Sequence, residues 1–521
     1  MSAPALTQCD IAIVGYGPVG SALAILLAQY GHTVTVLERW LDPYPMPRAV
    51  HFDDEVARVL QACGIGAALG DISEPADVYE WRNASGTPLV RFGNSGMGRG
   101  GWPSSSMFNQ PALEARLESR ATELTAITVR RGVEVVGVTQ DDEGVSLTAL
   151  DRNGTDVAVR CRYAIGCDGA NSTVRQLLDI TSTDLGFFYD WLIVDVVLHE
   201  PRVFDPINVQ VCDPARPTTV VSGGPGRRRW EFMRVPGESL DDLNSLDAAW
   251  KLLAAWDVTP QNATLERHAV YTFSARHAQQ WRRGRVLLAG ERRHQVSCVA
   301  GQGMCSGIRD AANLAWKLDI VLSGRGDSTV LDSYTEERLP HVRAVIDLSI
   351  ELGKIICVPD PAEAAARDEF MSAAVTDGTT SIPALPPLTG ALLASGDPVA
   401  GHVFPQGMVA VGGSRGVRRF DDVHGVGWRL VTVAPDPIEL PAGLSEWFAG
   451  EGGTIVAVTP DVDVDGAYAI WFHEHRCTWA LQRPDFHVHG VASDAEGALA
   501  LLVDLHQRLT NRAMIHQTQG A

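Results

Sequence analysis

The stretch Cys9–Arg39, "CDIAIVGYGPVGSALAILLAQYGHTVTVLER", decides the fold of this chain. Its apolar residues 10–14 predict a strand, and residues 21–30, rich in alanine and leucine, predict a helix. Between them residues 15–20 spell G-x-G-x-x-G, and residues 33–37 predict a second strand that ends in an acidic side chain. This strand–turn–helix–strand order is typical of the unit with which a Rossmann fold binds a dinucleotide.

The residue types of this unit suit the phosphates of a dinucleotide. Gly15 permits a tight turn, Gly17 lets the backbone approach a pyrophosphate, and Gly20 lets the helix and strand pack closely. The helix N-terminus that follows the turn offers free N–H groups and a positive dipole end to the phosphates. We therefore predict that a pyrophosphate binds at this turn.

Glu38 ends the second strand, where a carboxylate can accept hydrogen bonds from a ribose. Such a carboxylate prefers a free 2′-hydroxyl to a 2′-phosphate, so NADP is disfavoured at this site. The same G-x-G-x-x-G spelling recurs at residues 96–101, "GMGRGG". No apolar strand precedes that copy and "WPSSS" follows it in place of a helix, so we expect a flexible loop there.

The composition narrows the class of protein. A chain of 521 residues predicts two or three domains. The net charge of −20 argues against nucleic acid or an anionic membrane as a partner. We find no apolar run of the ~18 residues that a membrane helix needs, and no signal-peptide pattern. The nine cysteines form no CxxC pair, which favours a reducing, cytoplasmic setting.

Four further motifs follow the first unit in order. "YPMPRAVHFDDEVARVL" places Arg48 in a loop before a helix, and "FNQPALEARL" places Gln110 just ahead of a helix that starts at Pro111. "YAIGCDGANSTVRQLL" places Asp168 and Gly169 after a strand. "GRVLLAGERRHQVSCVAGQG" runs from a strand into G-Q-G, where the helix "MCSGIRDAANLAWKL" begins.

This order of motifs resembles the class A flavin-dependent aromatic hydroxylases, the para-hydroxybenzoate hydroxylase-like group. The resemblance covers roughly residues 8–350 and is closest to the 3-(3-hydroxyphenyl)propionate hydroxylase-like and polyketide-tailoring members. It implies FAD as the resident cofactor and NADH or NADPH as a transient co-substrate. A single credible Rossmann turn agrees with one resident dinucleotide.

The resemblance also implies a set of cofactor-binding residues. The glycine turn would hold the FAD pyrophosphate, Glu38 the adenosine ribose, and Arg48 the phosphate and ribityl region. The full set comprises Gly15, Gly17, Pro18, Val19, Gly20, Glu38, Arg39, Arg48, Gln110, Val135, Asp168, Gly169, Glu291, Gly301, Gln302, Gly303 and Met304.

The loop that precedes the G-Q-G helix start departs from the family pattern. That pattern reads Gly-Asp-Ala-Ala-His, two residues, a proline, and G-Q-G. Here Glu291 replaces the aspartate, arginines 292–293 replace the alanines, and Ser297 replaces the proline, which adds an N–H donor. Cys298 follows, and could be oxidised or be a small buried residue. Arg292 and Arg293 are either solvated or paired with the FAD pyrophosphate or with an acidic neighbour. The catalytic candidates are His294, Ser297, Cys298 and Arg48.

Two classes of function remain open from the sequence. The first is an NAD(P)H-consuming monooxygenase that hydroxylates a phenolic acid or aromatic polyketide, with O₂, through a flavin C4a-hydroperoxide. The second is a flavoprotein with altered chemistry, of the Baeyer–Villiger or oxidase type, or a non-catalytic flavin- or ligand-binding protein. The departures in the 291–298 loop keep the second class open.

The expected fold is α/β: a Rossmann-like FAD-binding domain with an inserted antiparallel-sheet substrate domain and a thioredoxin-like C-terminal domain. The expected boundaries are 1–185 with 286–380, then 186–285, a linker at 381–390, and 391–521. The last domain has no CxxC, so we expect a packing role or a homodimer contact.

Some residues outside these motifs also carry expectations. We expect substrate contacts near residues 48–55 and on the inner face of the sheet. Trp191, Arg229 and Phe232 are either such contacts or plain sheet packing. Arg216 and the arginines 227–229 are expected to be solvated. "WFHEHRC", residues 471–477, could mimic a metal site, but its alternation indicates a strand, and we predict no metal site.

Overall fold

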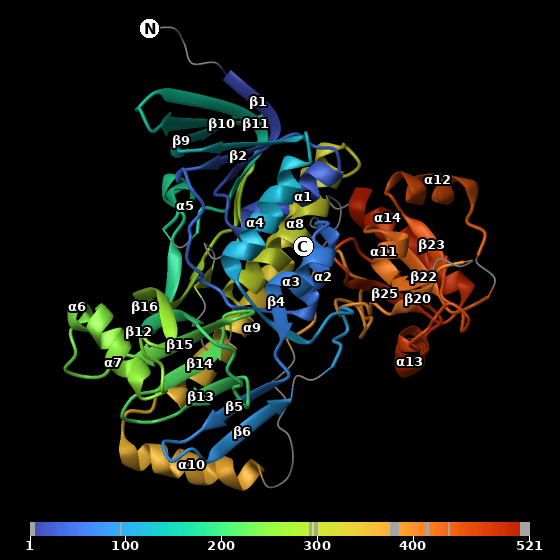
Figure 1. Ribbon diagram of the computed structural model, residues 1–521. Coiled ribbons are helices and arrows are strands. Elements are labelled where there is room, and N and C mark those ends of the chain that lie inside the picture. The colour runs from blue at the N-terminus through green and yellow to red at the C-terminus, as the bar shows by residue number, and fades with distance from the viewer. Residues whose placement is uncertain are drawn as a thin grey trace, which may run out of the picture.

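The computed structural model describes residues 6–93, 96–169, 171–290, 294–295, 301–375, 385–412, 416–435 and 438–510. Three bodies are visible in Figure 1: a sheet with helices at the top, a second sheet below it, and a C-terminal body beside the helices. Among the described residues, no helix has the length and apolarity that crossing a bilayer requires.

The first sheet is built on the predicted unit. Its strand order is β17-β18-β11-β1-β2-β8, and a β9–β10 hairpin adds to β11. Four neighbouring pairs from β18 to β8 are parallel, as a Rossmann fold requires. The bounds are β1 Leu6–Val14, β2 Val34–Glu38, β8 Ile127–Arg131, β9 Val133–Gln140, β10 Val145–Asp151, β11 Asp156–Gly166, β17 Arg282–Arg283 and β18 Val286–Leu288.

Helices cover this sheet on the side that faces the C-terminal body (Figure 1). The apolar helix α1 is buried along most of its length and packs with α8 in one core. The bounds are α1 Pro18–Gln29, α2 Asp54–Ala62, η1 Gly66–Ala68, α3 Leu69–Ile72, α4 Gln110–Thr122, α5 Thr173–Leu177, α8 Gly303–Leu322, η3 Ser328–Leu331 and α9 Asp332–Ile356. A small sheet of β3 His51–Asp53, β7 Ser105–Phe108 and β4 Ser73–Pro75 joins α2 to α4.

The second sheet contains the predicted substrate sheet and more. Its order is β19-β16-β12-β15-β14-β13-β5-β6. Strands β5 Val78–Arg82 and β6 Pro88–Gly93 extend it, although they precede residue 186. The other strands are β12 Ser182–Leu198, β13 Asn208–Val211, β14 Thr218–Ser222, β15 Arg227–Met233, β16 Ala263–Ala278 and β19 His294–Gln295. Helices α6 Leu240–Leu243 and α7 Leu246–Ala254 lie at one end, and α10 Pro361–Val375 lies below β6 (Figure 1).

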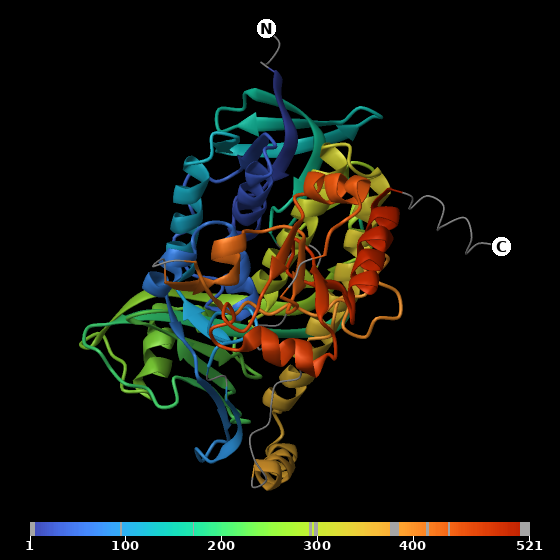
Figure 2. The same cartoon turned by 90° about the vertical axis from the view of Figure 1, so that its right-hand side faces the viewer.

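The C-terminal body has a four-stranded sheet of order β23-β22-β24-β25, in which β22 and β23 are parallel and the other pairs antiparallel. It packs on the first body and shares a hydrophobic core with it. In that core the rings of Trp316 of α8 and Trp428 pack edge to face, with their centroids 5.5 Å apart. Figure 2 shows this body in front of the helices of the first. The bounds are β20 Met408–Ala410, β21 Val417–Arg419, α11 Phe420–His424, β22 Arg429–Thr432, α12 Ala442–Gly450, β23 Thr454–Ala457, α13 Ala467–Glu474, β24 Trp479–Gln482, β25 Val488–Ala492 and α14 Ala495–Thr510.

The structure corrects two expectations about secondary structure and burial. The segment "WFHEHRC" is not a strand: α13 includes His473, and His475 ends that helix. The alternation misled because the segment is too short to separate period 2 from period 3.6. Arg228 and Arg229 are buried rather than solvated, at 5% and 1% exposure.

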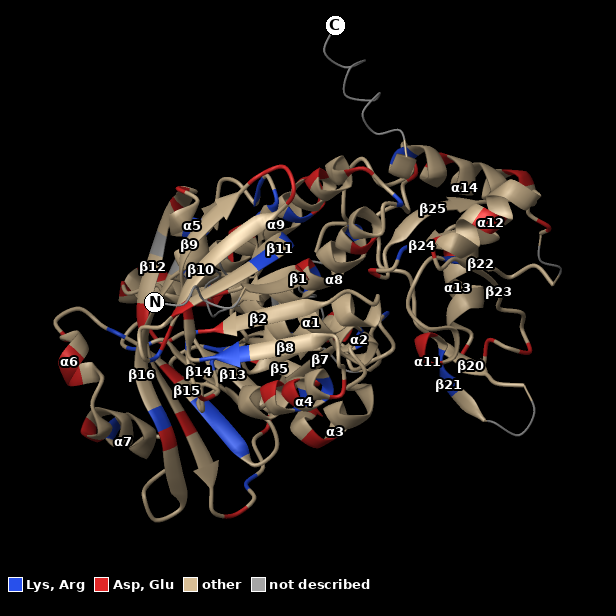
Figure 3. Ribbon diagram, turned by 90° about the horizontal axis from the view of Figure 1, so that it is seen from above, with Lys and Arg blue, Asp and Glu red and all other residues tan. Residues whose placement is uncertain are grey.

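Acidic residues occur in all three bodies. Figure 3 shows them on α4, α6 and α12, which belong to three different parts of the molecule.

Candidate active site

A cavity of about 1100 Å³ lies where the first and second sheets meet the start of α8. Nearly all the cofactor residues implied by the sequence line it, although they come from distant parts of the chain. On its wall are Gly15, Gly17, Pro18, Val19, Glu38, Arg39, Arg48, Gln110, Val135, Asp168, Gly169, Gly301, Gln302, Gly303 and Met304. The motifs that are separated along the chain therefore converge on one space.

The first glycine turn needs its glycines for close packing. Gly15 has a φ of +102°, and a Cβ there would stand 2.5 Å from the carbonyl oxygen of Cys167. Gly20 does not line the cavity; a Cβ on it would stand 2.1 Å from the carbonyl oxygen of Gly15. At Gly17 the nearest atom to such a Cβ is Nη2 of Arg48, at 3.8 Å, so this position faces open space on the cavity wall. A cradle for a phosphate-sized group is thus present at the start of α1.

Glu38 is held in place at the end of β2. One carboxylate oxygen accepts a hydrogen bond from the Tyr16 N–H at 2.8 Å, and the other accepts one from the Trp40 N–H at 2.9 Å. Each oxygen has a further lone pair, so the fixed carboxylate can still accept hydrogen bonds from ribose hydroxyls.

Gln110 organises the loop that carries Arg48. Its side-chain oxygen accepts the N–H groups of Arg48 at 2.9 Å and Ala49 at 2.6 Å, and its amide donates to Glu114 at 2.6 Å. The helix α4 begins at Gln110 itself, one residue before the expected start. The Arg48 guanidinium remains half-exposed on the cavity wall, 3.8 Å from Glu114.

Asp168 has a structural task within the first sheet. Its carboxylate accepts hydrogen bonds from the Ser172 hydroxyl at 3.1 Å and from the Val174 N–H at 3.2 Å, both at the start of α5. Gly169 follows with a φ of +65° and also lines the cavity. These contacts fix the backbone after β11 against the cavity.

The start of α8 forms another part of the wall, and two adjacent acids of α2 stand beside it. Gln302 is the N-cap, and Arg309 donates to Gln302 at 3.1 Å and to Asp53 at 2.6 Å. Burial tends to raise the pKa of Asp53, but the Arg309 guanidinium holds it below its usual value. Burial and the charge of Asp53 raise the pKa of Asp54 to about 6.

His51 is a wall residue that the sequence did not single out. Its Nε2 lies 2.9 Å from the Ser105 hydroxyl oxygen, and burial lowers the pKa of its imidazole. Burial thus favours the neutral ring, whose unprotonated nitrogen can accept a hydrogen bond. A signal was present in the sequence, since His51 lies within the expected 48–55 region, but nothing distinguished it from its neighbours.

Part of the altered loop lies outside the described residues. Glu291, Arg292, Arg293, Ser297 and Cys298 fall there, and their expected roles stay predictions. The backbone of His294 forms β19, which pairs with the end of β16 opposite His277.

The second sheet gives the cavity an aromatic and apolar wall. Its members there are Tyr79, Trp81, Phe92, Ile193, Val221, Tyr271 and Phe273, with Asn208, Thr219 and Glu231 as polar neighbours. Of the three residues considered as substrate contacts, Arg229 lies on the wall, whereas Trp191 and Phe232 pack in the sheet cores.

The buried arginines of this sheet hold the Arg48 loop. Arg229 binds Asp195 at 2.7 and 3.0 Å and donates to the carbonyls of Arg48 at 2.8 Å and Pro47 at 2.7 Å. Arg267 also donates to the Pro47 carbonyl and lies 3.7 Å from Asp195. Sequence reasoning missed Arg267 and Asp195 because their pairing depends on strand register within the sheet.

Comparisons with known proteins show the family to which the chain belongs. Residues 8–349 match the family model described as "FAD binding domain", and residues 401–507 match "HcaD C-terminal domain". The chain is 39% identical to a probable NADH-specific resorcinol 4-hydroxylase of Rhodococcus jostii over 95% of this chain and 94% of that protein. It is 35% identical to a 3-(3-hydroxy-phenyl)propionate/3-hydroxycinnamic acid hydroxylase of Comamonas testosteroni, over 72% of this chain and 64% of that one.

Solved structures share the whole fold. The flavin-dependent monooxygenase PieE, in complex with FAD and substrate, has a TM-score of 0.78 and 22% identity over 97% of this chain and 100% of that one. Aklavinone-11 hydroxylase, with FAD and aklavinone, has a TM-score of 0.77 and 22% identity over 98% and 100%. The expected α/β architecture and FAD as cofactor are confirmed. The chain belongs to the FAD-binding-domain family, among its flavin-dependent aromatic hydroxylases.

Proposed function

We propose that this chain uses NADH and O₂ to hydroxylate a small, uncharged phenol of the resorcinol type. The observation that carries the substrate class is the charge of the cavity wall. In the described part of the second sheet, the wall arginines Arg229 and Arg267 are already shared with Asp195 and with backbone carbonyls. A substrate carboxylate would therefore have to compete with Asp195 for these two guanidinium groups, while the half-exposed Arg48 on the same wall is assigned to FAD.

Acidic groups on the same wall strengthen the argument. Glu231, Asp53 and Asp54 line the cavity; Asp53 is bonded to Arg309 at 2.6 Å, and Glu231 lies 3.8 Å from Arg229. Placing a carboxylate beside them without a partner costs several kcal/mol. A dihydroxybenzene instead needs an aromatic wall and hydrogen-bonding groups, which this cavity offers.

We assign the FAD-binding roles to the wall residues in the order of the motifs. The glycine turn at Gly15–Gly20 would hold the pyrophosphate, and Glu38 the ribose. Arg48 would contact the phosphate and ribityl region, and the N–H groups at Gly301–Met304 would face the flavin ring. The cradle at Gly17 and the fixed Glu38 carboxylate support this assignment. When bound, the flavin would be reduced by NADH and would then activate O₂.

The remaining chemistry belongs to the protein. The aromatic wall orients the phenol and excludes water. Asp54 is suited to accept the phenol proton, because burial raises its pKa to about 6, and the neutral His51 ring can accept a hydrogen bond from the phenol hydroxyl. Loss of the phenol proton makes the ring richer in electrons at the carbon to be hydroxylated.

A reducing compartment suits this chain. Of the nine cysteines in the sequence, the eight that the structure describes are free thiols. We propose a cytoplasmic enzyme on this basis.

The test compares two phenols with the purified protein. We expect a flavin absorbance spectrum, NADH consumption that rises with resorcinol, and a product 16 mass units heavier. We expect kcat/KM for resorcinol to exceed that for 3-(3-hydroxyphenyl)propionate by about 100-fold, because the carboxylate is left unpaired. A preference for the propionate would contradict the proposed substrate class. NADH consumption that yields only hydrogen peroxide with every phenol would contradict the hydroxylase.

A further inference from the structure

Helix α2 is bound to the C-terminal body through a buried arginine. Arg58 of α2 is fully buried, and its guanidinium binds Asp421 at 2.6 and 2.9 Å and donates to the Phe404 carbonyl at 2.5 Å. The same guanidinium lies 4.3 Å from the centre of the Phe486 ring. Because a buried arginine fork demands fixed partners, α2 and the C-terminal body are held in one relative position.

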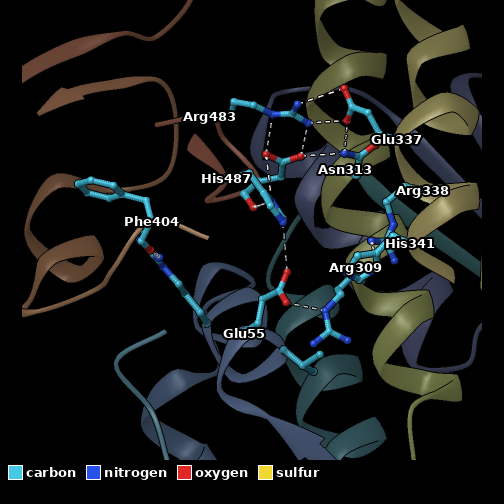
Figure 4. A network of polar contacts seen from close by, with 12 residues as sticks. Glu55, Arg309, Asn313, Glu337, Arg338, His341, Phe404, Arg483 and His487 are labelled. Carbon is cyan, nitrogen blue, oxygen red and sulfur yellow. Dashed lines mark hydrogen bonds and ion pairs between the residues drawn. The ribbon is translucent and has the colours of Figure 1, made fainter. Parts of the chain in front are cut away.

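A turn of the C-terminal body, residues 483–487, makes a second contact with the flavin-domain helices (Figure 4). Arg483 binds Glu337 of α9 at 2.7 Å and Asp485 at 2.6 Å, and Asn313 of α8 donates to Asp485 at 2.8 Å. These groups are buried and mutually satisfied. The turn is therefore a rigid base on α8 and α9.

His487 carries this contact to the start of α2. Its Nδ1 lies 2.9 Å from the Asp485 carbonyl oxygen, and its Nε2 lies 3.7 Å from Glu55 Oε1. On the other side of Glu55, Oε2 accepts a hydrogen bond from Arg309 at 2.6 Å. Figure 4 shows His487, Glu55 and Arg309 in sequence.

Arg309 links Glu55 to two residues of the cavity wall. It binds Glu55, Asp53 and Gln302, while the Gln302 amide lies 3.3 Å from the same Asp53 oxygen. Asp53 is the N-cap of α2 and Gln302 the N-cap of α8, so one guanidinium ties two helix starts together. Asp53 and Gln302 line the cavity, whereas Arg309 and His487 do not.

A third contact runs through the loop at residues 96–101. The Gly100 N–H donates to Asp54 at 2.6 Å, while its carbonyl accepts the Gln406 amide at 2.5 Å. The Gln406 N–H also donates to the Arg99 carbonyl at 2.7 Å. The loop therefore lies between the C-terminal body and an acid of the cavity wall.

From these contacts we propose that the C-terminal domain is a positioning element of the flavin site. Its contacts with Arg58 and Glu55 hold α2, whose first turn begins at Asp53; Glu55 and Asp53 bind Arg309, and Arg309 binds Gln302 where α8 begins. Arg309 and His487 are then positioning residues. The inference rests on the proposed function, in which the start of α8 faces the flavin.

The test uses the full-length enzyme and two variants, His487→Ala and Arg309→Lys. We measure FAD affinity by fluorescence titration, the midpoint potential of the bound flavin, and the hydrogen peroxide formed per NADH. A shift of the α8 start by about 1 Å should change function by about 10- to 100-fold. We therefore expect the FAD Kd to rise about tenfold in His487→Ala and more in Arg309→Lys, with a shifted potential and more peroxide.

His489→Ala is the matched control. This histidine is also buried and lies two positions further along the same segment, but its partners are the Leu392 carbonyl and Asp504, both within the C-terminal domain. We expect it to lower the melting temperature and leave FAD affinity, potential and peroxide yield unchanged.

The outcomes separate this inference from the proposed function. If the wild type neither binds FAD nor hydroxylates a phenol, the proposed function fails. If the wild type does both, and a folded His487→Ala variant matches it in FAD affinity, potential and peroxide yield, the positioning role is overturned. Equal effects of His487→Ala and His489→Ala also overturn it, because the effect is then general to the domain. Arg309→Lys keeps the charge, so it tests the fork geometry without leaving Asp53 and Glu55 unpaired.

Discussion

Two loops of this molecule have the sequence pattern G-x-G-x-x-G, at residues 15–20 and 96–101, but the backbone of each loop faces different surroundings. In both, a Cβ would strike a neighbour: 2.1 Å from the Gly15 oxygen at Gly20, and 2.3 Å from Asp54 Cγ at Gly98. In the first loop, the Gly17 N–H makes no hydrogen bond within the described part of the chain and lies on the cavity wall.

The second loop uses up its backbone donors inside the protein. The Gly98 N–H donates to the Trp102 carbonyl at 2.7 Å, and the Gly100 N–H donates to Asp54 at 2.6 Å. Expected to be a flexible loop, it is instead packed between the C-terminal domain and α2. Both loops let the backbone approach a neighbour closely: in the second loop the neighbour is the protein itself, and in the first, under the proposed function, it is FAD.

Gly20→Ala should give the largest effect. Its Cβ collides with the Gly15 carbonyl and pushes the turn out of shape, at a cost of about 3 kcal/mol. We expect FAD affinity to fall by at least about 100-fold, measured by flavin fluorescence. Gly70→Ala, where a Cβ meets nothing within 4 Å, is the control. Unchanged FAD binding in Gly20→Ala would remove the first loop from the cofactor site.

Asp54→Asn tests how the second loop is held. The Asp54 pKa is raised to about 6 from 3.8, so between these values the folded state holds a proton that the unfolded chain releases. The stability due to this group is therefore full below pH 4 and is lost as pH rises through 6, by about 3 kcal/mol. Asparagine should remove this dependence while still accepting the Gly100 N–H. Denaturant midpoints at pH 4 and pH 7.5 check this, and the same slope in both proteins would refute it.

Gly98→Ala should act on stability more than on the cofactor. The added carbon presses on the Asp54 side chain and should lower the free energy of unfolding by about 1–2 kcal/mol. We expect FAD affinity to change far less than in Gly20→Ala. Parallel unfolding and FAD titrations measure the two effects. If both glycine variants lose FAD equally, the distinction between the loops is wrong.

Glu38→Gln should give the smallest effect. The amide keeps one oxygen for the Tyr16 or Trp40 N–H but turns an NH₂ donor toward the other. We expect FAD affinity to fall by about fivefold, as for the loss of one hydrogen bond worth about 1 kcal/mol. A titration with FAD measures it, and Glu114→Gln is a comparison on the same wall.

The sequence was sufficient for those parts of the site whose signal is local. The first turn, the Asp168–Gly169 step after β11 and the G-Q-G start of α8 each sit within one strand–loop–helix segment, and the structure places them on one wall. Contacts between distant segments were not predictable. Strand β5 pairs in parallel with β13, far along the chain, so its place in the second sheet carries no local signal.

The burial of charged residues was also misjudged, because their partners are distant in the sequence. Arg228 and Arg229 look solvated when only their neighbours in sequence are considered. In the fold, Asp195 of β12 stands opposite Arg229 in register and receives it at 2.7 Å. Polarity predicts exposure only when no partner is available, and the partner is known only from the strand pairing.

Leu385 belongs to the segment expected to be a plain linker, yet it lines the cavity. The segment that links residues 286–380 to the C-terminal domain thus also forms part of the cavity wall. Chimeras that exchange the C-terminal domain between relatives at this segment would import a foreign surface against the phenol. For such a chimera to stay active, residues 385–390, α2 and the 96–101 loop would have to be transferred together with the C-terminal domain.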